Sequence, residues 1–160
     1  MISFNSFSQI KSLDDLLVIN SASDFERICI EKNLTIEYDK SDIIQYSYKE
    51  SNGAFQIATF YAEHNKYQIN TYYNIDFYNE IFDGIKKYGI FQKIIKMSNE
   101  DINGDTKEGE RQNLKLAVYR IKGYDIYLAF GNGSQGGYDN GRIFLVDLND
   151  VNRGFIFQIN

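Results

Sequence analysis

The chain has 160 residues, a net charge of −5 and 43% hydrophobic residues, with 13 Tyr, 12 Phe and no Trp. This length predicts one domain over residues 1–160, and the apolar content excludes disorder for most of the chain. The Lys and Arg residues are scattered along the sequence, which argues against nucleic-acid binding. No apolar run is long enough to span a membrane. The chain has a single cysteine and no signal-peptide pattern, so a cytoplasmic protein is expected.

Two helical patterns come first. Ser12 can cap a short helix over residues 13–18. Ser23 and Glu26 have capping-box spacing and predict a second helix that ends near Asn33. The apolar face of this second helix consists of Phe25, Ile28 and Cys29.

The period then changes to two, which predicts strands. Four such runs are Leu34–Tyr38, Ile44–Tyr48, Phe55–Tyr61 and Tyr67–Thr71. Between them, Ser51-Asn52-Gly53 can supply a positive φ, and residues 63–66 form a polar tip. An antiparallel meander is expected.

A third helix is predicted after residue 73, with Asn74 as its N-cap and Gly89 as its C′ residue. Its apolar stripe consists of Phe77, Ile81, Ile85 and Tyr88. Strand patterns return at Phe91–Met97, Leu114–Arg120, Asp125–Phe130 and Ile143–Leu148. We therefore expect an α+β fold, mainly an antiparallel sheet of about seven to nine strands with two or three helices packed on it.

The residues that usually carry acyl-transfer or metal chemistry are scarce. Cys29 lies on the apolar face of a helix and is expected to be a buried core residue. The single histidine, His64, is expected to be an exposed turn residue. With 22 Asp and Glu residues, carboxylate pairs arise by chance, and no catalytic pair is assigned. We expect neither an enzyme nor a cofactor.

One acidic segment partly fits the calcium-loop template. From Asn99, the residues Asp101, Asn103, Gly104 and Glu110 fall at positions three, five, six and twelve. Asn99 replaces the usual aspartate at position one, and strands rather than helices are predicted on both sides. The pattern favours a long acidic hairpin loop and leaves calcium binding as an alternative.

A glycine-rich segment over residues 131–137 has the spacing G-x-G-x-x-G directly after a predicted strand. A dinucleotide site needs a helix after this motif, because the helix N-terminus binds the pyrophosphate. Here the chain continues through Tyr138 and Asp139 into another predicted strand. The segment 131–141 is therefore interpreted as a hairpin loop.

The C-terminal quarter resembles a known group of proteins. The residues that carry the resemblance are Ile126-Tyr127-Leu128-Ala129-Phe130-Gly131, Gly136-Gly137-Tyr138-Asp139 and Ile143-Phe144-Leu145-Val146-Asp147-Leu148. They look like the C-terminal portion of SMI1/KNR4-type proteins, the SUKH superfamily, which includes many bacterial immunity proteins. The early Leu-Pro element of that superfamily is missing, since the chain has no proline. The resemblance implies an α+β protein that binds a toxin, often a nuclease, and catalyses nothing.

The sequence thus favours a non-catalytic inhibitor, an immunity protein that neutralises a basic bacterial toxin by direct binding, as in contact-dependent growth inhibition. The alternative is a module that binds a small ligand or calcium. The oligomeric state stays open. The residues expected to contact the partner are Glu100, Asp101, Asp105, Glu108, Glu110, Tyr138 and Asp139.

Overall fold

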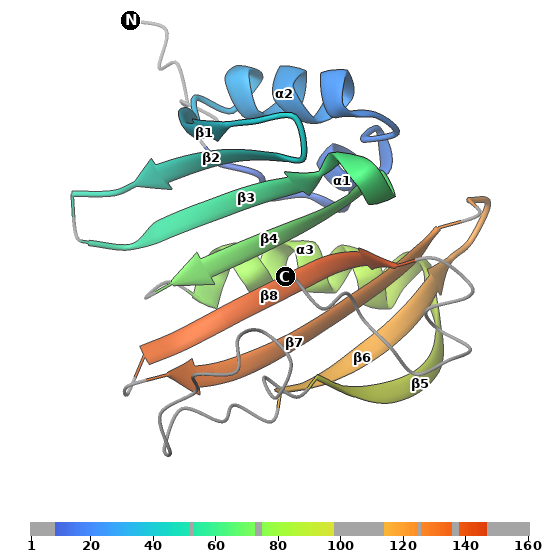
Figure 1. The fold of residues 1–160 in the computed structure, drawn as a ribbon. Coiled ribbons are helices and arrows are strands. Elements are labelled where there is room, and N and C mark those ends of the chain that lie inside the picture. Colours follow the sequence, from blue (N-terminus) through green and yellow to red (C-terminus); the bar gives the residue numbers. More distant parts are fainter. Residues whose placement is uncertain are drawn as a thin grey trace, which may run out of the picture.

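The computed structural model describes residues 9–51, 53–72, 75–97, 114–124, 126–135 and 138–146. Its helices are α1 (Leu13–Leu17), α2 (Ala22–Glu31) and α3 (Ile75–Tyr88), with a 3₁₀ turn at Ala62–His64 (Figure 1). Its strands are β1 (Thr35–Asp39), β2 (Ile43–Lys49), β3 (Phe55–Tyr61), β4 (Lys66–Tyr72), β5 (Gly89–Met97), β6 (Leu114–Ile121), β7 (Tyr127–Gln135) and β8 (Tyr138–Val146).

The eight strands form one antiparallel sheet in the order β1-β2-β3-β4-β8-β7-β6-β5. The α+β prediction is therefore confirmed. The described chain contains a helix followed by a four-stranded meander twice: α2 with β1–β4, and α3 with β5–β8. The fourth strands of the two halves pair with each other, with Ile69 opposite Ile143. No repeat is evident in the sequence, so the halves share an order of elements rather than a residue pattern.

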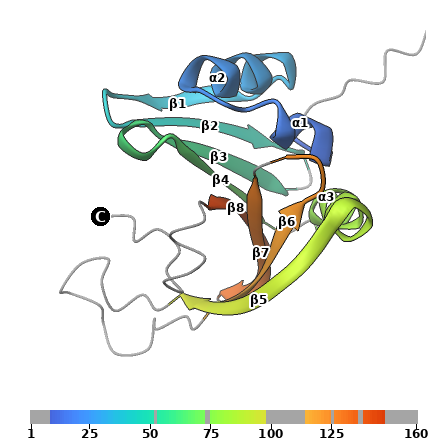
Figure 2. The ribbon, with the colours of Figure 1, turned by 90° about the vertical axis from the view of Figure 1, so that its right-hand side faces the viewer.

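Helices cover one face of this sheet (Figure 2). α1 and α2 lie over the first half, and α3 lies over the second half and contacts β4, β5, β6 and β8. The two halves share one hydrophobic core, which includes Phe25 of α2, Ile81 of α3 and Phe130 of β7. None of the described helices is both long enough and apolar enough to cross a lipid bilayer.

Both N-terminal helices begin at a serine with extended backbone. Ser12 Oγ accepts a hydrogen bond from the Asp15 amide at 3.2 Å, and the Asp15 carboxylate accepts one from the Ser12 amide. This confirms the predicted cap of α1. The cap of α2 is Ser21, which accepts from the Asp24 amide at 3.2 Å, so the predicted capping box at Ser23 and Glu26 is wrong. Ser23 lies inside the helix, because the serine two residues earlier already satisfies an amide of the first turn.

The end of α3 also differs from the prediction. Gly89 does not adopt a left-handed C′ conformation and is instead the first residue of β5. A Cβ at Gly89 would collide with the Ile85 carbonyl oxygen and lie 3.0 Å from Cδ1 of Tyr119, so close packing explains this glycine. Tyr88 is 46% exposed and leaves the buried stripe formed by Ile81 and Ile85. The predicted N-cap, Asn74, lies outside the described residues.

The hairpin loop predicted for residues 131–141 is wrong. β7 continues to Gln135, and β8 begins at Tyr138, with Gly131 opposite Arg142 and Gly133 opposite Asn140. Glycine has a low strand propensity, but the hydrogen bonds between antiparallel strands come from the backbone and need no side chain. In the β2–β3 turn, by contrast, Gly53 has the predicted positive φ, at +91°.

Hydrogen bonds from buried side chains of the sheet fix the N-terminal segment. The side chain of Gln56, fully buried in β3, accepts from the Ile10 amide at 2.9 Å and donates to the Ile10 carbonyl at 3.0 Å. The Tyr67 hydroxyl donates to the Leu16 carbonyl at 3.0 Å. Because buried backbone groups without a partner are costly, Gln56 makes burial of the segment before α1 possible.

Candidate protein-binding surface

The first half of the sheet ends in an acidic strand with large exposed apolar side chains. All five residues of β1 are exposed, including Ile36 at 47% and Tyr38 at 38%. Glu37 and Asp39 alternate with them in sequence. We call Ile36, Glu37, Tyr38 and Asp39 the acidic edge. No described strand lies beyond β1, so the outer backbone groups of this edge have no sheet partner in the described chain.

A bulge shapes the acidic edge. The pairing of β1 with β2 shifts between Ile36 and Tyr38, which leaves Glu37 without a residue opposite it. The Glu37 carboxylate accepts a hydrogen bond from the Ser47 hydroxyl of β2. A bulge often redirects the side chain of the extra residue. Here the bulge and the hydrogen bond to Ser47 together hold the Glu37 carboxylate over the sheet.

Lys40 follows the acidic edge and contacts its tyrosine. The Lys40 ammonium nitrogen lies 4.8 Å from the centre of the Tyr38 ring. A hydrogen bond with the Tyr38 side chain raises the pKa of Lys40 above its ordinary value. The contact restrains the tyrosine ring and reduces the entropy it would lose on binding a partner.

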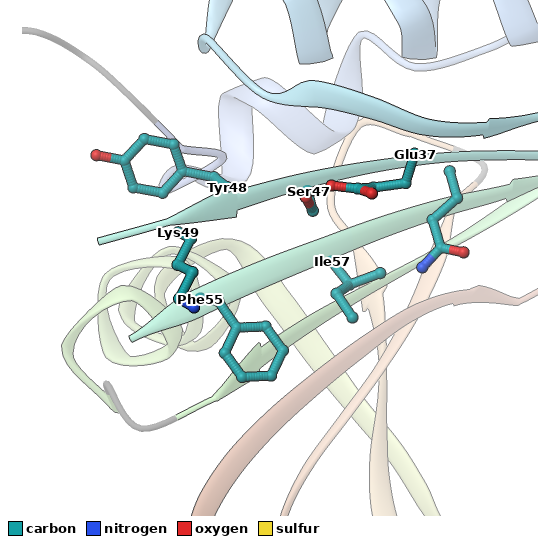
Figure 3. Close-up of a pocket in the computed structure, with 7 residues that line it drawn as sticks. Glu37, Ser47, Tyr48, Lys49, Phe55 and Ile57 are labelled. Carbon is teal, nitrogen blue, oxygen red and sulfur yellow. Dashed lines mark hydrogen bonds between the residues drawn. The ribbon is translucent and has the colours of Figure 1, made fainter. Parts of the chain in front are cut away.

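A groove of about 490 Å³ lies beside the acidic edge, over β1, β2 and β3. We call it the β2–β3 groove; it is lined by Glu37, Gln45, Ser47, Tyr48, Lys49, Phe55 and Ile57. Figure 3 shows Phe55 and Ile57 on the same side of β3, whereas the ring of Tyr48 points away from them. Phe55 also stacks on Tyr72 of β4, with ring centres 4.3 Å apart. Glu37 belongs to both surfaces, so the acidic edge and the groove are continuous.

Most of the residues predicted to bind a partner lie outside the described residues, namely Glu100, Asp101, Asp105, Glu108 and Glu110. The calcium-loop segment that begins at Asn99 lies outside them too. Tyr138 and Asp139 are the first two residues of β8 and pair with Gln135 and Ser134. They belong to a strand, not to the loop in which the sequence had placed them.

The two single residues considered for chemistry lie where the sequence predicted. Cys29 is fully buried, and burial raises the pKa of its thiol to about 12, so the reactive thiolate is scarce at neutral pH. His64 is exposed in the 3₁₀ turn between β3 and β4. Within the described residues, no group of three or more His, Cys, Asp and Glu side chains is arranged to hold a metal ion.

The sequence did not single out the acidic edge. Its alternating residues predicted a strand, but alternation does not say whether a strand lies at the end of a sheet or inside it. Two carboxylates in a five-residue strand were the available signal, because edge strands tolerate charge and central strands rarely do.

A comparison of the chain with protein-family models, with curated proteins and with solved structures gave no match. The resemblance of the C-terminal quarter to SUKH proteins therefore stays a prediction.

Proposed function

We propose that the protein is a non-catalytic inhibitor that binds a basic protein partner through the acidic edge and the β2–β3 groove. The proposal extends to its biology: the partner is a bacterial toxin, and the chain acts as its immunity protein. The observation that carries the proposal is the acidic edge, where two carboxylates and two partly exposed apolar side chains share a strand that has no outer neighbour among the described strands.

The chemistry of this edge suits a cationic protein. Exposed carboxylates increase the rate at which a basic partner reaches the surface, and the effect weakens with salt. Tyr38 can then bury its ring while its hydroxyl keeps a polar partner, which makes tyrosine a frequent anchor of interfaces. The outer backbone of β1 can pair with an extended segment of the partner.

The groove adds apolar area next to the charge. Phe55 and Ile57 are both partly exposed on β3. An apolar centre beside charged groups is the usual arrangement of a specific interface. A nuclease toxin fits this surface because its substrate-binding cleft is cationic, and an acidic inhibitor that covers the cleft excludes nucleic acid.

The experiment is a pull-down from native cell extract at low and moderate salt, with bound proteins identified by mass spectrometry. The baits are the tagged wild-type protein, the double variant Glu37→Lys/Asp39→Lys, and the control Asp14→Lys/Glu63→Lys. The control makes the same charge change at two exposed acids away from β1. We expect the wild type and the control to recover one stoichiometric basic protein, and the β1 variant to lose it. Equal recovery by all three baits contradicts the proposed surface.

A second candidate function is small-ligand binding in the β2–β3 groove. Its volume of about 490 Å³ lies within the range of ligand pockets, and Glu37 and Lys49 offer opposite charges to a ligand. A metabolite that raises the melting temperature of the wild type but not of a Phe55→Ala variant would favour this function. Calcium belongs in the same screen, because the segment from Asn99 to Glu110 was predicted as a possible calcium loop.

A further inference from the structure

The second half of the sheet ends in a strand whose charge is opposite to that of β1. Residues 86–97 contain four Lys, residues 114–124 contain two Lys and one Arg, and neither range contains Asp or Glu. These two ranges therefore hold seven of the 17 cations of a chain whose net charge is −5. They include the whole of β5 and β6, which pair with each other at the end of the sheet.

Large apolar side chains are exposed on this same strand. Phe91 is 53% exposed, Ile94 is 55% exposed and Ile90 is 39% exposed. Exposed apolar residues are ordinary when scattered, but a group of them on an outer strand indicates a binding surface. We call Ile90, Phe91, Lys93, Ile94 and Arg120 the basic edge.

The two faces of the basic edge differ. Phe91 lies opposite Tyr119, with ring centres 5.6 Å apart, and Tyr119 contacts Phe130, which contacts Phe82 of α3. Phe91 is thus the exposed end of a row of rings on the α3 side. Ile90 lies opposite Arg120, on the other side of the sheet. A strand placed beside β5 would meet an aromatic contact on one face and a guanidinium on the other.

Part of the β5 backbone has no sheet partner on its outer side within the described part of the chain. A bulge lies between Phe91 and Lys93, and the Gln92 side-chain amide donates to the Ile90 carbonyl at 2.8 Å. This arrangement blocks pairing at the start of the strand, as bulges on edges often do. From Lys93 to Met97 the register with β6 is regular, and no described strand lies on the outer side.

The charges decide which strand fits there. Lysine on an edge discourages pairing with a second copy of the same edge, because like charges would lie opposite each other. An acidic strand removes that penalty and places its carboxylates near Lys93 and Arg120. We propose that β5 binds an acidic, extended peptide segment of a partner protein as a ninth strand, with apolar side chains of the segment on Phe91 and Ile94. This site is separate from the acidic edge, and the proposal does not depend on the proposed function.

The test uses fluorescence anisotropy with three labelled ten-residue peptides. One alternates glutamate with valine, one alternates lysine with valine, and one is the glutamate peptide with an N-methyl group on every backbone amide. We expect the glutamate peptide to bind with an affinity that falls as the salt concentration rises. The other two peptides should bind at least about tenfold more weakly, which corresponds to a loss of about 1.4 kcal/mol of binding free energy. Equal binding of the N-methylated peptide contradicts strand addition, because that peptide keeps its charge but cannot pair.

Protein variants locate the site. Lys93→Glu should weaken binding of the glutamate peptide by about tenfold or more. The matched control is Lys40→Glu, which reverses an exposed lysine beside the outer strand of the other half and should leave binding within about twofold of the wild type. Thermal melting of each variant confirms that it folds. Equal loss in both variants would mean that the peptide responds only to net charge and would contradict the site.

Two other occupants are separated in the same experiment. A 15-residue oligothymidylate that binds more tightly than the glutamate peptide, and is lost in Lys93→Glu, would assign the edge to nucleic acid and overturn the peptide proposal. Self-association that rises with concentration and is abolished by Glu37→Lys/Asp39→Lys would assign it to the acidic edge of a second copy, and would overturn it too. A monomer without oligothymidylate binding supports the proposal alongside the peptide result.

Discussion

β1 and β5 occupy matching places in the two halves of the molecule. Each is the first strand of a four-stranded meander, each lies at an end of the sheet, and each carries a bulge near its third or fourth residue. Their side chains differ in charge: Glu37 and Asp39 in β1, Lys93 and Lys96 in β5. The comparison shows that one order of elements can present two different surfaces, because outer strands are free to vary while inner strands must pack.

The halves also differ in how they are covered. In the first half, α1, α2 and the segment before α1 pack on the sheet, and Gln56 binds the backbone of that segment. In the second half, α3 is the described helix on the sheet. We therefore expect more of the folding free energy to depend on side chains of the first half, and the predictions below test this difference.

The largest effect is expected from the aromatic residues that join each helix to the sheet. Phe25 is fully buried and contacts Tyr46 and Phe60, with ring centres 6.1 and 5.4 Å away. Phe25→Ala should lower the free energy of unfolding by about 3–5 kcal/mol. Phe82 contacts Phe130 but is only partly buried, so Phe82→Ala should cost less than about 2 kcal/mol. Urea unfolding measures both, and equal costs would contradict the difference between the halves.

A second pair of variants compares two glutamines that bind backbone groups. Gln56→Ala leaves the buried amide and carbonyl of Ile10 without their partner and should cost about 2–4 kcal/mol. Gln92→Ala removes an exposed bond to the Ile90 carbonyl, which water can replace, and should change stability by less than about 0.5 kcal/mol. The same unfolding curves give both values. A small effect of Gln56→Ala would contradict the role of this side chain in holding the N-terminal segment to the sheet.

The sequence predicted the elements that depend on neighbouring residues, but it did not predict the pairing of strands that are far apart in the chain. The presence of eight strands and three helices among the described residues follows from period-two and period-3.6 patterns, although the ends of β7 and β8 do not, and the meander of β1–β4 follows from short turns such as the one at Gly53. The pairing of β4 with β8 joins residues far apart in the chain, and no local pattern reports it. For the same reason the sequence did not show that β1 and β5 are the outer strands.

The site residues were harder to predict. A count of charges suggested one acidic surface, whereas the structure separates an acidic strand from a basic one. Lys93 and Arg120 are 27 positions apart in the sequence, and the pairing of β5 with β6 brings them to one edge. The glycines after Phe130 predicted a loop because strand propensity ignores the backbone bonds that hold β7 to β8.

The contact between α1 and α3 provides a third prediction, at the place where the two halves meet on the helix side. A Cβ at Gly84 of α3 would lie 2.9 Å from the Leu13 Cβ of α1. Alanine normally stabilises a helix relative to glycine by up to about 1 kcal/mol. Here Gly84→Ala should instead destabilise the protein by about 1–3 kcal/mol, because the helices must separate. A double variant with Leu13→Gly, which removes the clashing Cβ, should lose less than the sum of the two single costs. Stabilisation by Gly84→Ala would contradict the close packing.

The smallest effect at neutral pH comes from two groups of the first half that titrate only in base. Burial raises the pKa of Cys29 to about 12 from its ordinary 9.0, and that of Tyr61 to about 12 from 10.0. The unfolded chain releases these protons first, so their stabilising contribution is complete below pH 9 and declines as the pH rises toward 12. Urea midpoints measured from pH 8 to 11.5 should fall over that window. In Cys29→Ala/Tyr61→Phe the fall should be shallower, and an unchanged slope would contradict the assignment.

The central claim is that the two outer strands bind partners of opposite charge, and quantitative binding to one wild-type and two variant proteins tests it most directly. The variants are Glu37→Lys/Asp39→Lys and Lys93→Glu, and the ligands are the basic partner recovered from the extract and the glutamate peptide. The account predicts that the β1 variant loses the basic partner and keeps the peptide, while the β5 variant does the reverse. If either variant loses both ligands while its melting temperature stays near that of the wild type, the two edges do not act separately and the claim is contradicted.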